Sequence, residues 1–457
     1  MINKQFAAKA LHYIELFGII TTLALLPIDR FPYLHTVPLR LGLVSLVCLI
    51  IATCFRLYQL YKARDLKLKK LLLVAAVLTL PFIAYGLSVT YAIDSKQALS
   101  AAYLFGLGIT RAFAFCVLLS TNVQLRRISE KTIYIVTAVV VAFGLFQFFF
   151  DVFGAHTVIT DLKSCCTSNS TYVFPRVHST ALEPLYFDHY LMIPIWLLTF
   201  RFLRNKKSRS DKRLIVLFVA TTTLFILTVA RSATIGLIFA STIFIIALWK
   251  TEGFKRFLVY ASKLWGAAIL LTILFVGVSG IAANFIDKTA QYAPRGLGSI
   301  SLFGSHAIDF DDGSSKTRYE LWPKAIGYFK EEPLTGVGAD NSRIRLNREE
   351  YNKGVETKKL QPFNNDAIGY IVEFGLLGIS LILPLLILLV YVVRHNFKQK
   401  LAHWATPFVF VLIGMAVQSN FFHSVLLTRT WFVIGMLLFI YVSPETDSSK
   451  ITRVKKI

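Results

Sequence analysis

The stretch that decides the fold reads LFILTVARSATIGLIFASTIFIIALW, residues 224–249; it is predominantly apolar, with Arg231 near its middle. A charged side chain at the centre of a bilayer costs from about 2.5 to more than 10 kcal/mol. The stretch belongs to an apolar run over residues 214–249, which is too long for one membrane-spanning helix and right for two. We therefore expect two helices that meet at a turn, with Arg231 at that turn and near one face of the membrane.

The composition indicates that the whole chain is a membrane protein. Of its 457 residues, 55% are hydrophobic and only 16% are charged, whereas about a quarter of the residues of a soluble protein are charged. The mean hydropathy is +0.59, and apolar runs recur along the whole length. We expect an all-α fold: a polytopic integral membrane protein with about 12 transmembrane helices, one large outer (periplasmic) loop and no removable signal peptide.

Twelve apolar runs have roughly the length of a span. They cover about residues 10–27, 39–59, 71–91, 100–120, 132–150, 187–203, 214–230, 232–249, 258–282, 366–393, 404–423 and 426–442. This pattern predicts three parts along the sequence. They are residues 1–282 with nine spans and an outer loop at 151–186, residues 283–365 as the large outer segment, and residues 366–457 with three spans and a tail.

The basic loops predict the orientation. Four of them lie on one side of the twelve-span arrangement: RLYQLYKARDLKLKK (56–70), RFLRNKKSRSDKR (201–213), KTEGFKR (250–256) and RHNFKQK (394–400). Because cytoplasmic loops collect Lys and Arg, that side and both termini are expected to be cytoplasmic. These basic loops account for most of the net charge of +23, so the positive charge does not indicate nucleic-acid binding.

Arg231 and Arg318 are the first candidates for a site on the outer side. Arg231 is followed by the small residues 232–234 and by the positive end of the next helix, which together favour an anion site. The alternative is an arginine that snorkels to the membrane surface. Arg318 lies beside Tyr319 and Trp322, and a guanidinium next to aromatic rings suits a sugar phosphate. The alternative is an ordinary surface arginine.

Two polar clusters lie at the starts of predicted spans. RVHSTALEPLYFDHYL (176–191) brings five ionisable groups together, and Glu183 is a possible hydrogen-bond acceptor or base; the alternative is a set of solvated loop residues. The five are Arg176, His178, Glu183, Asp188 and His189. FNNDAIGYIVEFGLLG (363–378) opens the tenth span with Asn364, Asn365 and Asp366, for which a helix cap is the simplest interpretation. Glu373 follows about two turns later and requires a partner.

Residues 316–333 predict a short amphipathic helix in the outer segment, with one face formed by Leu321, Ala325, Ile326 and Phe329.

The sequence lacks the motifs of several kinds of chemistry. The chain has no GxxxxGK[ST] loop, no GxSxG elbow, no HExxH and no zinc spacing, so we expect no ATP hydrolysis, no metal and no cofactor. Two of the five cysteines, Cys165 and Cys166, are neighbours in a polar loop.

Four motifs, in this order, resemble the O-antigen ligase and O-antigen polymerase superfamily over most of the chain. EPLYFDHYL (183–191) is similar to a motif found before a middle span in polysaccharide polymerases. TVARSATIGL (228–237) matches at Arg231 and Gly236. The outer segment 314–341 matches at Arg318, Trp322, Ala325, Phe329, Pro333, Gly336 and Gly338. NNDAIGYIVEFGLLG (364–378) matches at Asn365, Glu373, Gly375 and Gly378.

The resemblance implies a metal-independent transferase at the outer face of the bacterial inner membrane. Its donor would be a glycan on undecaprenyl diphosphate, and its acceptor a growing glycan or lipid A-core; a chain-length regulator stays open as a partner. The two arginines would hold the diphosphate leaving group. The residues expected to be catalytic are Arg231, Arg318, Glu183 and Asn364. Those expected to bind the substrates are Arg176, His178, Tyr319, Trp322, Asn365 and Asp366.

One position departs from the family pattern. Ligases of the family usually carry His, the proposed base, where this chain has Asn364, and an amide cannot take a proton from the acceptor. Glu183, His178 and Asp366 are the candidates for the base, in that order. The missing His and the Glu-Pro motif favour a polymerase over a ligase. A transporter of lipid-linked sugars is the alternative from another class and a non-enzymatic scaffold is a third, but two related halves are not visible.

Overall fold

Every regular element in the described part of the chain is a helix. The computed structural model describes residues 4–28, 37–152, 176–249, 253–286, 313–357, 360, 363, 365–399, 401–420, 424 and 426–443. The helices are α1 (Lys4–Leu25), α2 (Val37–Ala63), α3 (Lys67–Ser88), α4 (Ser95–Thr121), α5 (Val123–Val152), α7 (Pro184–Arg204), η2 (Lys206–Ser210), α8 (Lys212–Leu227), α9 (Arg231–Leu248), α10 (Phe254–Ile286), α12 (Gly313–Glu331), α13 (Ser342–Leu346), α14 (Arg348–Asn352), α15 (Asp366–Lys398), α16 (Pro407–Gln418) and α17 (Thr428–Val442).

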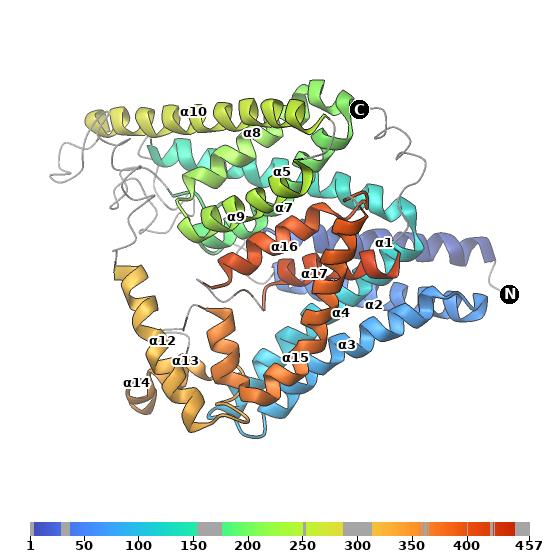
Figure 1. Cartoon of the computed structure of the whole chain (residues 1–457), viewed down its shortest axis with the longest axis vertical. Helices are drawn as coiled ribbons and strands as arrows, with labels where there is room; N and C mark the ends of the chain where they lie inside the picture. Colours follow the sequence, from blue (N-terminus) through green and yellow to red (C-terminus); the bar gives the residue numbers. More distant parts are fainter. Residues whose placement is uncertain are drawn as a thin grey trace. The chain divides into compact units, whose positions relative to one another are not determined.

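Each predicted span falls on one helix (Figure 1). Among the described residues, seven helices are both long enough and apolar enough to cross a membrane: α2, α3, α4, α5, α9, α10 and α15. α16 and α17 are shorter apolar helices. The expectation of a helical, multi-pass membrane protein is therefore confirmed. The number of twelve spans and the side on which each loop lies stay predictions.

The helices form two compact units that are interleaved along the sequence. Unit 1 contains Met1–Gly18, Leu46–Leu125 and Phe310–Ser448, and unit 2 contains Ile19–Ser45, Arg126–Asp309 and Ser449–Ile457. Each unit is described below by itself. The division of the sequence into three consecutive parts stays a prediction.

Unit 1 is built around α3, α4, α15 and α17, which pack against one another. Aromatic side chains join the four helices. Tyr85 of α3 stacks on Phe105 of α4 with ring centroids 3.9 Å apart, and Phe105 meets the edge of Trp431 of α17 at 4.9 Å. Phe374 of α15 lies 4.6 Å from Tyr85. Within lipid, the hydrophobic effect does not drive helices together, so the core depends on packing. These stacked and edge-to-face contacts add to its dispersion energy.

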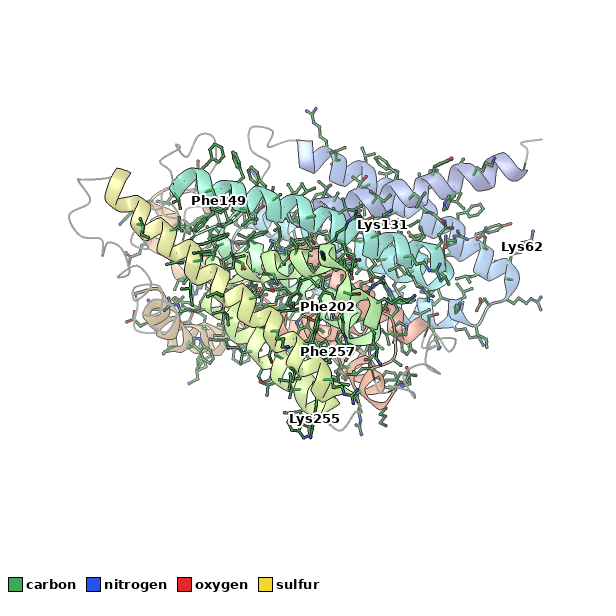
Figure 2. The ribbon with its side chains drawn as sticks, turned by 90° about the horizontal axis from the view of Figure 1, so that it is seen from above. Lys62, Lys131, Phe149, Phe202, Lys255 and Phe257 are labelled. Carbon is green, nitrogen blue, oxygen red and sulfur yellow. The ribbon has the colours of Figure 1, made fainter. Side chains whose placement is uncertain are left out.

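Unit 2 packs α8 against α10 and α7, and Figure 1 shows α8 running beside α10. Phe202 of α7, labelled in Figure 2, meets the edges of two rings: Phe218 of α8 at 5.8 Å and Tyr260 of α10 at 5.7 Å. A second group joins α7 to α9, where Phe244 lies 5.3 Å from Trp196 and 5.4 Å from Phe200. α7 is therefore buried on nearly all sides and serves as the centre of this unit.

The predicted amphipathic helix exists, but its buried face is different. α12 begins at Gly313 and ends at Glu331, and Leu321 and Ala325 are buried in a cluster completed by Val337, Phe363 and Val372. Ile326, expected on the same face, is 56% exposed. The expectation for Ile326 is wrong because the buried stripe continues from Ala325 to Tyr328, one turn later on the same side.

Candidate functional site

The helices on either side of Arg231 meet at the predicted turn. α8 ends at Leu227, Thr228 caps it, and α9 begins at Arg231 itself, with Ala230 as its N-cap residue. Between them Val229 has a φ of 53°, a left-handed conformation that a β-branched residue adopts only where its surroundings impose it. The turn at Arg231 is thereby confirmed, and Arg231 lies half-buried in the first turn of α9.

Thr228 is the centre of a buried hydrogen-bond network at this turn. Its hydroxyl donates to the Oδ2 of Asp188 and lies 2.8 Å from the carbonyl of Phe225, and it accepts from the backbone N–H of Ala230 at 3.3 Å. Its own carbonyl accepts from the Nε of Arg176 at 3.0 Å. Asp188 is completely buried in α7. The network ties the turn to α7 and to the segment before it, three residues from Arg231.

The segment 176–181 runs through the interior of unit 2 and is held by α5. The side-chain amide of Gln147 pairs with the backbone of Ser179, accepting from its N–H at 2.8 Å and donating to its carbonyl at 3.0 Å. The hydroxyl of Ser179 donates to the carbonyl of Val140 at 2.7 Å. Because these bonds satisfy an irregular backbone away from water, the segment has one defined path.

The five ionisable groups of this region have different surroundings. His178, Asp188 and His189 are buried, Arg176 is half-buried, and Glu183 is exposed at the N-cap of α7, directly before Pro184. The interpretation of the whole cluster as solvated loop residues is therefore wrong for three of the five. His178 is buried because residues 177–179 run through the interior of unit 2, and Asp188 and His189 are buried because they belong to α7, the centre of that unit.

In unit 1, α15 is broken at Gly375, whose φ is 55° and ψ is −152°. The strap Pro333–Ser342 binds this break through four backbone hydrogen bonds. The N–H groups of Val337 and Gly338 donate to the carbonyls of residues 372 and 373, and the N–H groups of residues 376 and 377 donate to the carbonyls of residues 333 and 334, at 2.9–3.0 Å. Glu373 thus ends a short first helix and is not set two turns into a continuous span.

The two glycines of this contact leave no room for a side chain. A Cβ on Gly375 would lie 2.6 Å from the carbonyl oxygen of Pro333, and one on Gly336 would lie 2.5 Å from the backbone of residues 372 and 373. Both glycines also have positive φ. The family motifs in these two segments therefore mark one close backbone contact.

Glu373 has the partner that its position requires. It is buried, and the hydroxyl of Ser342 donates to its Oε1 at 2.6 Å. The other side of the strap is tied to the connection between α3 and α4, because the side chain of Asn341 accepts from the N–H of Asp94 at 2.6 Å and donates to its carbonyl at 3.2 Å. Desolvation and the Asp94 carboxylate raise the pKa of the nearby Tyr351 hydroxyl.

The start of α15 is a capped helix end. Asn365 accepts from the N–H of Ile368 at 2.9 Å, so the cap interpretation is confirmed for this residue. The carboxylate of Asp366 accepts from the N–H of Ser424 at 3.0 Å and from its hydroxyl at 2.5 Å. This carboxylate holds the connection between α16 and α17, and Asn364 lies outside the described residues.

The remaining predicted residues lie in or next to α12. Arg318 and Tyr319 belong to this helix, but their side chains lie outside the described part of the chain. Trp322 is 50% exposed. Cys165 and Cys166 also lie outside the described residues. Among the side chains that are described, no group of three or more His, Cys, Asp or Glu could hold a metal ion.

Three residues that carry these contacts had no predicted role: Thr228, Gln147 and Ser342. Gln147 could have been found, since a lone amide within the apolar run 132–150 needs a partner. Thr228 and Ser342 carry no such signal, because serine and threonine are common within membrane helices and turns.

A comparison with known families supports the resemblance. Residues 216–383 match the family model described as O-Antigen ligase. The matched range contains Arg231, Arg318 and Glu373 but begins after Arg176 and Glu183. No curated protein matches the chain. The match confirms the predicted resemblance to the O-antigen ligase and polymerase superfamily over these residues.

Proposed function

We propose that the protein transfers a glycan from undecaprenyl diphosphate to a sugar hydroxyl at the outer face of the inner membrane, without a metal ion. The observation that carries this proposal is the buried network around Thr228, which fixes the turn directly before Arg231 within the family-matched range. A charged group held in one position by a rigid support is what stabilisation of a transition state requires.

The chemistry assigns a role to each charge. The acceptor oxygen forms a bond to the anomeric carbon of the donor while the bond from that carbon to the diphosphate oxygen breaks. The diphosphate stays on the lipid and gains negative charge, which the guanidinium of Arg231 and the positive end of the α9 dipole stabilise. Arg318 is the proposed second cation of this clamp. Cleavage of the bond between the donor sugar and the diphosphate supplies the driving force, so ATP is not needed.

The proton of the acceptor hydroxyl needs a base, and exposure favours Glu183. Its side chain is exposed at the N-cap of α7, whereas His178 is only 1% exposed. The carboxylate of Asp366 is already bonded to Ser424. The order Glu183, His178, Asp366 is therefore retained in the proposal.

We infer that the product is a polymer of O-antigen or of a related surface polysaccharide. Asn364 in place of the family histidine and the Glu183–Pro184 motif support a polymerase. The second candidate is a ligase that joins the finished polymer to lipid A-core, which the description of the matching family favours.

The test replaces Arg231 or Arg318 with Ala in a strain that lacks the chromosomal gene. The matched control is Arg213→Ala, which removes an exposed arginine at the start of α8. We expect both clamp variants to lose glycan transfer by a factor of about 100 to 1000, the loss typical of a removed transition-state contact, with unchanged protein in the membrane. Wild-type transfer by both clamp variants would contradict the clamp.

The glycans of the deletion strain separate the three activities. Single repeat units on the carrier or on lipid A-core, with no long chains, would identify a polymerase. Long chains on undecaprenyl diphosphate beside bare lipid A-core would identify a ligase. Repeat units that stay on the cytoplasmic face would contradict a transferase and identify a transporter.

A further inference from the structure

The last two turns of α15 line a cavity of about 330 Å³ with basic and aromatic side chains. The lining residues are Tyr391, Arg394, His395 and Lys398. Their spacing of three, four and seven residues places them on one face of the helix. A volume near 300 Å³ is the lower end of the range found for small-ligand sites. The cavity lies within the basic segment 394–400, which the charge pattern assigns to the cytoplasmic side.

Two further helices contribute to the aromatic side of this site. The ring of Tyr391 stacks on His395 at 5.8 Å and meets the edge of Tyr441 of α17 at 6.1 Å. Lys70 of α3 lies 5.8 Å above the Tyr441 ring, and its Nζ is 3.5 Å from the Tyr441 carbonyl. The cavity is therefore lined by α15 and lies next to a contact of α15 with α17, which α3 in turn meets through Lys70.

The cations of the cavity are not neutralised by acids. Within the described part of the chain, the ion pairs join neither Arg394 nor Lys398 to a carboxylate. Other inner-side arginines differ: Arg56 binds Glu15 through two nitrogens at 2.5 and 3.0 Å, and Arg201 lies 3.4 Å from Glu130. Within the described residues, Arg394 and Lys398 therefore keep their positive charge without a carboxylate partner.

An exposed apolar stripe on α15 leads to the cavity. Leu383, Leu386, Ile387 and Val390 are between 47% and 67% exposed. They lie on the helix turns directly before Arg394, so lipid chains along this stripe would carry their headgroups to the three basic side chains. Tyrosine is also enriched at the level of lipid headgroups.

We propose that this cavity binds the phosphate of an anionic phospholipid from the cytoplasmic leaflet. The guanidinium of Arg394 offers two parallel donors to phosphate oxygens, and Lys398 adds a point charge. Basic pockets between membrane helices on the cytoplasmic side bind such headgroups. Free phosphate shares the chemistry, but the apolar stripe favours a lipid. This site does not depend on the proposed glycan transfer.

The test measures the rise in unfolding temperature of the purified full chain in detergent as phosphatidylglycerol is added. Phosphatidylcholine and sodium phosphate, at equal phosphate concentration, are the comparison ligands. The variant is Arg394→Gln/Lys398→Gln. The matched control is Lys212→Gln/Arg213→Gln, which removes two exposed cations from the start of α8, on the predicted cytoplasmic side.

We expect a saturable rise with phosphatidylglycerol and little with phosphatidylcholine. The half-saturating concentration should increase about fivefold or more in the cavity variant and stay unchanged in the control variant. Equal shifts in the two double variants, or none in either, would overturn the proposal. If sodium phosphate alone gives the same saturable, variant-sensitive rise, the lipid assignment is overturned and the site is one for free phosphate. Mass spectrometry of the co-purified lipids gives a second measurement that does not depend on unfolding.

Discussion

The turn before Arg231 and the break in α15 each contain a residue with positive φ, but the two are held in different ways. Val229 and Gly375 have nearly the same φ, 53° and 55°. At Val229 a β-branched residue is kept in this conformation by hydrogen bonds from buried polar side chains, with Thr228 at their centre. At Gly375 the partners are backbone groups of the strap, and the requirement is the absence of a Cβ atom.

The difference indicates what each region is suited to do. The side-chain network of Thr228, Asp188 and Arg176 positions one charged residue, Arg231. Such a network is sensitive to small chemical changes in its side chains. The strap contact joins two backbones, tolerates any side chain that points away, and fails when a methyl group is added. We therefore expect substitutions at the turn to change activity first, and substitutions at the strap to change folding first.

Gly375→Ala should have the largest effect. The new Cβ would lie 2.6 Å from the carbonyl oxygen of Pro333, in a conformation that only glycine adopts easily. We expect a loss of about 3 kcal/mol or more of stability, seen as a lower unfolding temperature and a smaller monodisperse fraction in detergent. Gly369→Ala in the same helix is the control, because a Cβ there meets nothing within 4 Å. Equal behaviour of the two variants would contradict the close contact.

Thr228→Val should reduce glycan transfer by about 10- to 100-fold, because it removes the donor from a buried carboxylate and loosens the support of Arg231. The loss should appear in the turnover number and not in substrate affinity. Thr228→Ser should restore most of it, since the hydroxyl returns.

Thr242→Val is the control for this change, because Thr242 lies on the exposed face of α9 and bonds only within the helix, to the carbonyl of Ile238. A purified protein with normal turnover after Thr228→Val would show that the network does not position Arg231.

Ser342→Ala should cost about 1–3 kcal/mol of stability, since a donor to the buried Glu373 is removed. The backbone bonds of the strap remain, so transfer by the folded fraction should stay near normal. Thermal unfolding in detergent measures the loss, and Ser380→Ala on the exposed surface of α15 is the control. An unchanged unfolding temperature would mean that the backbone contact alone holds the strap.

Val229→Gly should have the smallest effect. Relief of about 1–2 kcal/mol of left-handed strain is offset by lost packing and by the backbone entropy of glycine. We expect the unfolding free energy to change by less than about 1 kcal/mol. Val229→Ala keeps the strain and loses the packing, so it should be the less stable of the two; the reverse order would contradict the strain.

Local signals in the sequence determined the helical membrane class, the turn at Arg231 and the cap at Asn365. Apolar length and capping residues act within one or two turns of helix, so the chain around them hardly matters. The same signals misplaced Ile326, because the side of α12 that is buried depends on what packs against it.

Only the tertiary structure decided the partners of the buried polar groups. Thr228 meets Asp188 and Arg176 across 40 and 52 residues, and Ser342 meets Glu373 across 31. The break at Gly375 likewise needs the strap to receive its backbone groups. Such pairs form when helices pack at a particular register, and hydrophobic periodicity carries no information about that register. The sequence therefore shows that a buried charge needs a partner, and the packing of the helices decides which residue it is.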